Sequence, residues 1–343
     1  MQLRPKYLLL KPLSLLLAGA GLMLAQTGGP RVGVVDFYGV RKVKIDAIKK
    51  ALAVKEGDPL PKSKGDTEEA IEQVPNVVAA RLEAACCEDG KAILYVGIEE
   101  KGAPHVTYND PPAGLVKLPQ EVHDEYTGFL SSVGLAVRNG KTEENLAQGH
   151  SLMSDPGVRK HQERFIELAD AHLDKIREVL RKSVDEEQRA IAAYVIGYTN
   201  DKKAVLPDLQ SALRDPDDTV RNNAMRSLGA IAVLATREPD RGIGVAPVWF
   251  VEMLNSIIWQ DRQTAAMTLV TITDKRDPSV MGLLKDRALP ALAEMARWQH
   301  LPHALPAYIL LGRVGGLSED QIQTAWKDGK REEVIQRVLK PAK

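Results

Sequence analysis

The chain has 343 residues, 44% of them hydrophobic and 27% charged, as in a globular protein of about two domains. Its 46 basic and 46 acidic residues cancel, so no overall positive charge is present to hold a nucleic acid or an anionic membrane surface. We therefore expect a protein partner, no nucleic acid, and contact with a membrane only indirectly, through an envelope partner.

The first residues, 1–25, have the layout of a secretory signal peptide. Basic residues precede an uncharged stretch, residues 12–25, which is rich in leucine and alanine and ends in small residues suited to cleavage. This stretch is shorter than the about 20 apolar residues that span a bilayer. We expect export to the periplasm or the extracellular space, with cleavage after Ala20 or Ala25; the alternative is an uncleaved N-terminal anchor.

Residues 31–101 predict a small α/β domain with the order β-α-α-β-β. The run "VGVVDFYGV" indicates a strand, and "KIDAIKKALAV" and "KGDTEEAIEQV" indicate helices. Period-two alternation on both sides of Asp89-Gly90 indicates a β-hairpin. One face of this hairpin is expected to hold Leu82, Ala84, Cys86, Ala92, Leu94, Val96 and Ile98.

Cys86 and Cys87 are the only cysteines of the chain, and they are adjacent. Neighbouring residues of a strand point to opposite faces, so we expect one thiol in the core and the other near solvent. A redox-active Cys-Cys bridge or an intermolecular disulfide is the alternative in an oxidising compartment.

The same region resembles the POTRA domain (polypeptide-transport-associated domain) of outer-membrane assembly factors and division proteins. The matching features are Phe37-Tyr38-Gly39 after the first strand, "LAVKEGDPL" at 52–60, "AIEQVPNV" at 70–77 and the closing Glu99-Glu100. The sequence departs from the pattern in its short second helix and in having no aromatic residue after "VPNV". The resemblance implies a role in envelope assembly or transport.

Residues 102–155 predict a linker with short helices. "PQEVHDEYTGFLSSVGLAV" and "TEENLAQGHSLMS" indicate two of them, around a loop at "RNGK". From Asp155 onward the pattern becomes wholly helical. Asp155 followed by proline is a good helix start, and one helix is expected over the following "GVRKHQERFIELADAHLDKIREVLRK".

Four segments of the C-terminal half can be laid over one another. They are "RAIAAYVIG", "RNNAMRSLG", "RQTAAMTLV" and "ALPAYILLG", which start at residues 189, 221, 262 and 304, so the intervals are 32, 41 and 42 residues. Periods of this length predict a solenoid of helix pairs. The pair "AVLPDLQSALR" and "DPDDTVRNNAMRSLGAIA" resembles a HEAT repeat, and the resemblance extends over 156–318. It weakens at Ala304, which replaces the arginine, and at Pro306, which is expected to interrupt the helix start. Residues 319–343 predict a C-terminal capping helix and a tail.

Three of these segments begin with arginine, the only repeated polar signal. In HEAT families the matching arginine lies with an aspartate between neighbouring repeats, so the resemblance implies a ladder of ion pairs along the stack. Exposed members of this ladder would instead be able to contact a partner. The candidate inter-repeat or partner-contact residues are Arg189 with Asp185, Arg221 with Asp217 or Asp218, and Arg262 with Asp261.

Other motif-like stretches are better explained without a chemical role. "GLAVRNGKT" has one residue too many between Gly134 and Gly140 for a phosphate-binding loop, and "GHSLM" around Ser151 lacks the last glycine of a nucleophile elbow. The seven histidines are scattered, and a metal site needs three or four convergent groups. The two closest pairs are His161 with His172 and His300 with His303. We predict no catalytic, cofactor-binding or metal-binding residue.

The sequence therefore predicts an α+β protein: a small β-α-α-β-β domain followed by an all-α, HEAT-like solenoid. We expect an exported, non-enzymatic protein-interaction scaffold that needs no cofactor. The alternative is an enzyme, a hydrolase or a lyase, built on the same helical scaffold.

Overall fold

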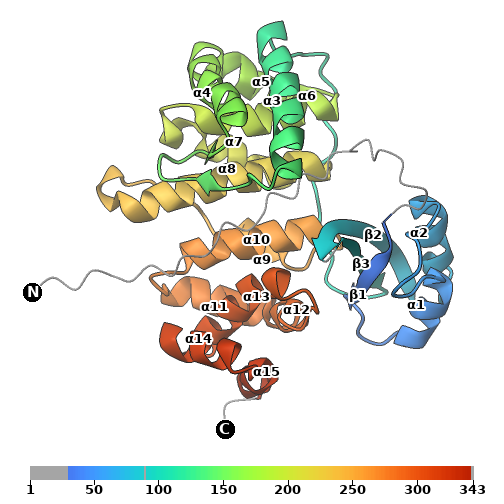
Figure 1. Ribbon diagram of the computed structural model, residues 1–343. Helices are drawn as coiled ribbons and strands as arrows, with labels where there is room; N and C mark the ends of the chain where they lie inside the picture. The colour runs from blue at the N-terminus through green and yellow to red at the C-terminus, as the bar shows by residue number, and fades with distance from the viewer. Residues whose placement is uncertain (1–29, 89, 341–343) are drawn as a thin grey trace, which may run out of the picture.

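The computed structural model describes residues 30–88 and 90–340. A three-stranded sheet with two helices is followed by a long array of helices (Figure 1), so the fold is α+β. The order β-α-α-β-β predicted for the N-terminal region is confirmed. Its elements are β1 (Val32–Tyr38), α1 (Ile45–Leu52), α2 (Lys64–Glu72), β2 (Val77–Glu88) and β3 (Lys91–Glu100).

Strand β3 is the centre of the sheet. It pairs in parallel with β1 and antiparallel with β2, and the pair Glu88–Lys91 closes the hairpin at the predicted turn, of which Asp89 itself lies outside the described residues. Leu82 lies opposite Val96, as predicted. Ala84 lies opposite Leu94, on the predicted face, although it is exposed. A register shift between Ala85 and Glu88 interrupts the alternation at Cys86, which is exposed as well.

Cys86 lies at an exposed position on β2 and is disulfide-bonded. The side chain of Cys87 lies outside the described residues. For Cys86 the expectation of a thiol is therefore wrong, and the alternative of a bridged cysteine applies.

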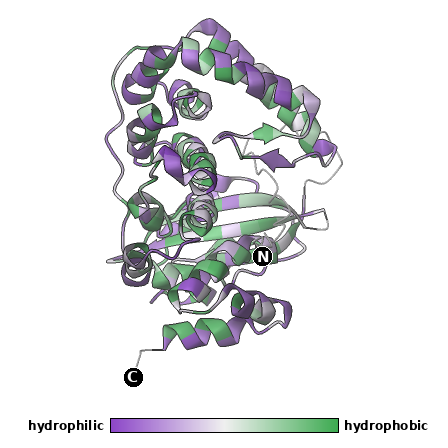
Figure 2. Cartoon of the chain, turned by 90° about the vertical axis from the view of Figure 1, so that its left-hand side faces the viewer, coloured by the Kyte–Doolittle hydropathy of each residue, from purple (hydrophilic) through white to green (hydrophobic). Residues whose placement is uncertain are grey.

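Both faces of the sheet are covered. Leu82, Leu94 and Val96 pack on α1 and α2, whereas Tyr38 and Tyr95 belong to the same apolar core as the C-terminal helices. Figure 1 shows the sheet held between α1 and α2 on one side and the helices around α10 and α12 on the other. In Figure 2 much of the sheet is coloured as hydrophobic, as expected for strands that are buried on two sides.

The region predicted as a linker with short helices forms one long helix and a small sheet. Helix α3 (Gln120–Arg138) spans the whole of the first predicted helix. The second predicted helix is wrong, because β4 (Glu144–Asn145) and β5 (Leu152–Met153) pair antiparallel there. Asn145 accepts a hydrogen bond from the backbone N–H of Ala147 and Gly149 adopts a φ of +78°, and both features favour a turn over a helix.

The rest of the chain is helical. The expected single helix after Asp155 is two helices, because the chain breaks at His172, while Asp155 caps the first of them as predicted. The helices are α4 (Pro156–Ala171), α5 (Leu173–Lys182), α6 (Glu186–Val195), α7 (Lys202–Ala212), α8 (Asp218–Arg237), α9 (Val248–Met253), α10 (Trp259–Ile272), α11 (Pro278–Arg287), α12 (Leu289–Met295), α13 (Leu301–Val314), α14 (Glu319–Lys327) and α15 (Arg331–Leu339), with short 3₁₀ turns η1 (Ile196–Tyr198) and η2 (Pro239–Arg241).

The four superimposable segments form one layer of packed helices. Helices α6, α8, α10 and α13, here called the inner helices, pack side by side, and α5, α7 and α9 pack against the first three of them from the other layer. In the opening turns of α8, Val220, Ala224 and Leu228 are completely buried. Most helices carry both hydrophilic and hydrophobic residues in Figure 2, as amphipathic helices of a two-layer stack must.

Two expectations for the C-terminal end are corrected. Pro306 does not interrupt α13, because it lies within the helix after its first turn. The tail after the capping helix is itself helical up to Leu339. In the described part of the chain, no helix combines the length and the apolar character needed to cross a membrane.

Candidate functional site

The three arginines that open the inner helices form a repeated, buried arrangement. Arg189 donates two hydrogen bonds to Asp215, at 2.8 and 2.9 Å, and Arg221 bonds the carboxylate of Asp261 at 2.8 to 3.2 Å. Arg262 reaches Glu294 at 3.4 Å. Each acid belongs to the next repeat along the chain, so the arginines join consecutive repeats.

Each arginine also bonds the turn in front of its own helix. The guanidinium of Arg189 donates to the carbonyl of Ser183, that of Arg221 to Asp215, and that of Arg262 to Ser256, always six residues earlier. These carbonyls would otherwise be buried without a partner. The arginine therefore holds a turn and the following repeat together.

The acids that the sequence suggested as companions have other roles. Asp185 and Asp217 cap the starts of α6 and α8 through bonds to the backbone N–H groups of Gln188 and Val220. Asp218 is exposed, and Asp261 bonds the preceding arginine of the series, Arg221, instead of its neighbour Arg262. The pairing of each arginine with an acid of its own turn is therefore wrong.

A segment of the predicted linker covers this row of ion pairs. Tyr108 packs over the guanidinium of Arg221 at 4.0 Å and bonds Asp261, and Asn109 donates its backbone N–H to the carbonyl of Arg214. Farther along, Gly114 pairs with the turn at Lys182. Burial alone would lower the pKa of Arg221, but the charge of Asp261 outweighs it and raises that pKa. Because the arginines are buried, they join consecutive repeats inside the stack and have almost no exposed surface for a partner.

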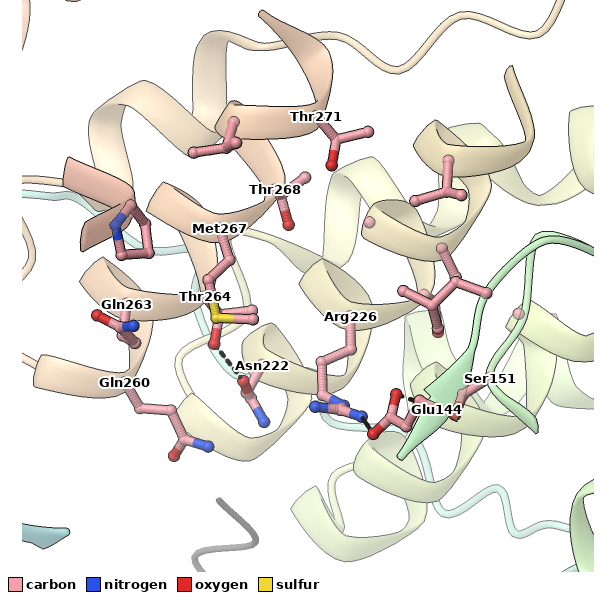
Figure 3. A pocket seen from close by; sticks show the side chains of 18 of the residues that line it. Glu144, Ser151, Asn222, Arg226, Gln260, Gln263, Thr264, Met267, Thr268 and Thr271 are labelled. Carbon is pink, nitrogen blue, oxygen red and sulfur yellow. Dashed lines mark hydrogen bonds and ion pairs between the residues drawn. The ribbon is translucent and has the colours of Figure 1, made fainter. Parts of the chain in front are cut away.

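A groove on the inner helices forms a well-defined cavity (Figure 3). It has a volume of about 660 Å³, within the range of about 300–1,000 Å³ typical of ligand sites. Residues of α6, η1, α8, α10 and α13 line it, and the loop 143–151 borders one end. None of the seven predicted candidate residues lies in it. Representative lining residues are Tyr194, Tyr198, Asn222, Ala230, Met267 and Ile309.

Several polar groups of the groove are paired with one another. Arg226 forms an ion pair with Glu144, which also accepts a bond from Ser151, and Thr264 donates to Asn222 (Figure 3). These pairs leave little net charge inside. The groove is therefore an apolar channel with neutral polar groups.

At the end nearest the loop, His150 is held by a buried lysine. Lys202 donates to Nδ1 of His150 at 3.1 Å and to the carbonyl of Gly197 at 2.7 Å. Burial, and then the charge of Lys202, lower the pKa of His150 to about 4, and burial lowers the pKa of Lys202 to about 7. At neutral pH the imidazole is therefore uncharged, and the described residues provide no hydrogen-bond partner for its Nε2.

At the other end, the N-terminal sheet positions α10. Glu83 accepts bonds from the backbone N–H groups of Trp259 and Gln260, so this strand residue caps a helix that has no cap of its own. Burial raises the pKa of Glu83 to about 7. Tyr95 stacks on Trp259 at 4.7 Å and bonds Nδ1 of His303 at 2.7 Å.

The other candidate motifs are accounted for by packing. Gly134 lies inside α3, so no phosphate loop forms there, and Ser151 bonds Glu144 and Gln162 with no histidine as a partner. His161 bonds Glu125 and Ser132, and His172 bonds Glu121. Among the described residues, no three acidic, histidine or cysteine side chains converge as a metal site would require.

A comparison with known protein families finds one match. Residues 173–240, from α5 to η2, match the family of HEAT repeats. A search of the curated proteins finds none that matches the chain. The HEAT-repeat character predicted from the sequence is thus supported for this segment.

Proposed function

We propose that this protein is a non-enzymatic scaffold that binds a protein partner in the groove of its inner helices. The HEAT-repeat match supports a role in protein interaction. The observation that carries the proposal is the groove itself, a largely apolar channel in which Glu144 is paired with Arg226 and Glu143 is exposed at the border. Open apolar surface of this extent on a stable stack is typical of an interaction site.

The arrangement of the titratable groups favours binding over catalysis. A hydrolase or a lyase needs an acid, a base or a nucleophile that is free to reach a substrate. In the groove, Glu144 is committed to Arg226, Nδ1 of His150 to Lys202, and Nδ1 of His303 to Tyr95. These contacts support the non-enzymatic proposal over the alternative of an enzyme on the same scaffold.

Met267 provides a test of the groove. It is exposed on α10 and lines the groove, so Met267→Arg places a charge in the channel without disturbing the core. Val248→Arg, at a similarly exposed position on α9 outside the groove, is the matched control. We expect the first variant to lose at least about tenfold in affinity for protein partners purified from the source cells, and the control to retain them. Equal recovery by both variants would contradict a partner site in the groove.

We also propose that the protein is exported, and that it works in envelope assembly or transport. The basic and apolar layout of residues 1–25 supports export, and the resemblance of residues 31–101 to a POTRA domain supports the envelope. We expect N-terminal sequencing of the protein from its source to begin between residues 21 and 29, in an extracytoplasmic fraction. An intact Met1 on protein recovered from the cytosol would contradict export.

A further inference from the structure

Gln263 is the most unusual polar group of the groove. Its side chain lines the groove from α10 and is only 5% exposed, yet both atoms of its carboxamide lack a hydrogen-bond partner among the described residues. Leaving a buried donor and acceptor unpaired costs about 1–3 kcal/mol each. Figure 3 shows Gln263 among the side chains that line the pocket.

A carboxamide has one acceptor and one donor side, which are complementary to the C=O and N–H of a peptide main chain. Two further buried nitrogens of residues that line the groove have no partner among the described residues: the indole Nε1 of Trp259, a donor one turn before Gln263 on the same face of α10, and Nε2 of His150 at the far end. A peptide segment in an extended conformation has unpaired main-chain N–H and C=O groups, which can form hydrogen bonds with these side chains.

The charges of the groove select against a charged partner. Its acidic and basic residues are Glu143, exposed at the border, and the ion pair of Glu144 with Arg226, while His150 and His303 are neutral because burial lowers the pKa of both. An unpaired charge brought into this channel would lose its water without gaining a counter-ion. The remaining walls are formed by aliphatic side chains and by the rings of Tyr194, Tyr198 and Trp259.

The size of the groove sets the length of the segment. It crosses four neighbouring helices, whose axes lie about 8–10 Å apart in packed pairs, so it is about 25–30 Å long. Extended chain rises about 3.3 Å per residue, which corresponds to about eight residues.

From these contacts we infer that the groove takes an extended, uncharged and mainly apolar peptide segment of about eight residues, anchored through its main chain by Gln263. This inference rests on the proposed function and specifies its partner. Because Gln263 contacts the main chain of the segment, we expect many different sequences to bind, provided that they are uncharged and mainly apolar.

The test uses a library of random nine-residue peptides displayed on phage and selected on the purified protein, with the strongest clone synthesised as a labelled peptide. We expect selected peptides without Asp, Glu, Lys or Arg. Gln263→Met keeps the shape but removes both hydrogen-bonding atoms, and it should weaken the binding of the labelled peptide about tenfold while leaving the melting temperature unchanged or higher. Gln260→Met is the matched control: Gln260 also lines the groove, but it is part-buried and its carboxamide is not among the buried unpaired groups, so the change should alter binding less than about threefold.

N-methylation of the labelled peptide, one backbone amide at a time, locates the anchor. One central methyl group should weaken binding to the wild type and have no further effect on Gln263→Met, because the two changes remove the same contact. Charged or helical consensus peptides, unchanged binding to Gln263→Met, a library without binders, or occupation of the groove by a fatty acid such as cis-parinaric acid would overturn the inference. The loss of cellular partners in Met267→Arg would still stand in the first three cases, so the proposed function is judged separately.

Discussion

Replacement of Arg221 by alanine is expected to lower the free energy of unfolding by about 3–5 kcal/mol, as when one partner of a buried ion pair is removed. Asp261 would remain in the core without its counter-ion, because it is 0% exposed and its other partners are the hydroxyl groups of Ser256 and Tyr108. The carbonyls of Asp215 and Pro216 would also lose their donor. Denaturant unfolding followed by circular dichroism measures the change.

Two control variants separate charge from volume. Leu228→Ala, in the same helix, removes only apolar packing and should cost about 2–5 kcal/mol. Arg221→Met combined with Asp261→Leu removes both charges, and it should cost less than Arg221→Ala alone because no unpaired charge remains. If the double variant is as unstable as the single one, the unpaired carboxylate is not the cause.

The ion pair of Arg221 with Asp261 shows which part of this arrangement could be predicted from the sequence. The recurrence of Arg189, Arg221 and Arg262 at one position of each segment, together with the resemblance to HEAT repeats, predicted a ladder of ion pairs between repeats; the structure has ion pairs at all three arginines and shows that they are buried. Their partners were wrong because short-range spacing favoured acids of the same turn. Those acids cap helix starts, where their own side chains reach the backbone at once, and the arginines extend to the next repeat.

Some residues that line the groove could have been identified from the same alignment of segments. Its residues on α8 and α10 occupy corresponding places: Asn222 and Gln263 follow the leading arginine by one residue, and Arg226 and Met267 follow it by five. Positions four apart lie on one face of a helix, so the shared offsets mark the face turned to the groove. What no spacing could show is that Gln263 has no hydrogen-bond partner among the described residues, because this depends on every neighbouring element.

The contact between the sheet and the helices could not be predicted from the sequence. Alternation in "KAILYVGIEE" indicated a strand, but it did not reveal that the face with Tyr95 meets residues about 200 positions later, as its bond to His303 shows. Gly97 marks the same contact, since a Cβ there would lie 2.3 Å from the carbonyl of Ile257. We therefore expect residues 31–101 to be unstable as an isolated fragment.

Among the residues of this contact, we expect replacement of Trp298 to lower the free energy of unfolding most. It follows α12, is 1% exposed, and packs between Tyr38 and Tyr95 of the sheet, with ring centroids 6.0 and 5.0 Å away. Trp298→Ala should cost about 3–5 kcal/mol, the usual loss for a large buried aromatic side chain. Its indole nitrogen has no hydrogen-bond partner among the described residues, so the change removes packing and leaves no polar group unpaired.

Hydrogen exchange followed by mass spectrometry shows where this stability is lost. The amides of β1 and β3 should exchange faster in Trp298→Ala, whereas those of α6, at the far end of the stack, should keep most of their protection. Trp326→Ala is the control, because Trp326 packs on Tyr308 of α13 and is away from the sheet. If the amides of β1 and β3 exchange equally fast in both variants, the attachment of the sheet to the helices does not depend on Trp298. The aromatic contact would then contribute no more than a contact elsewhere in the stack.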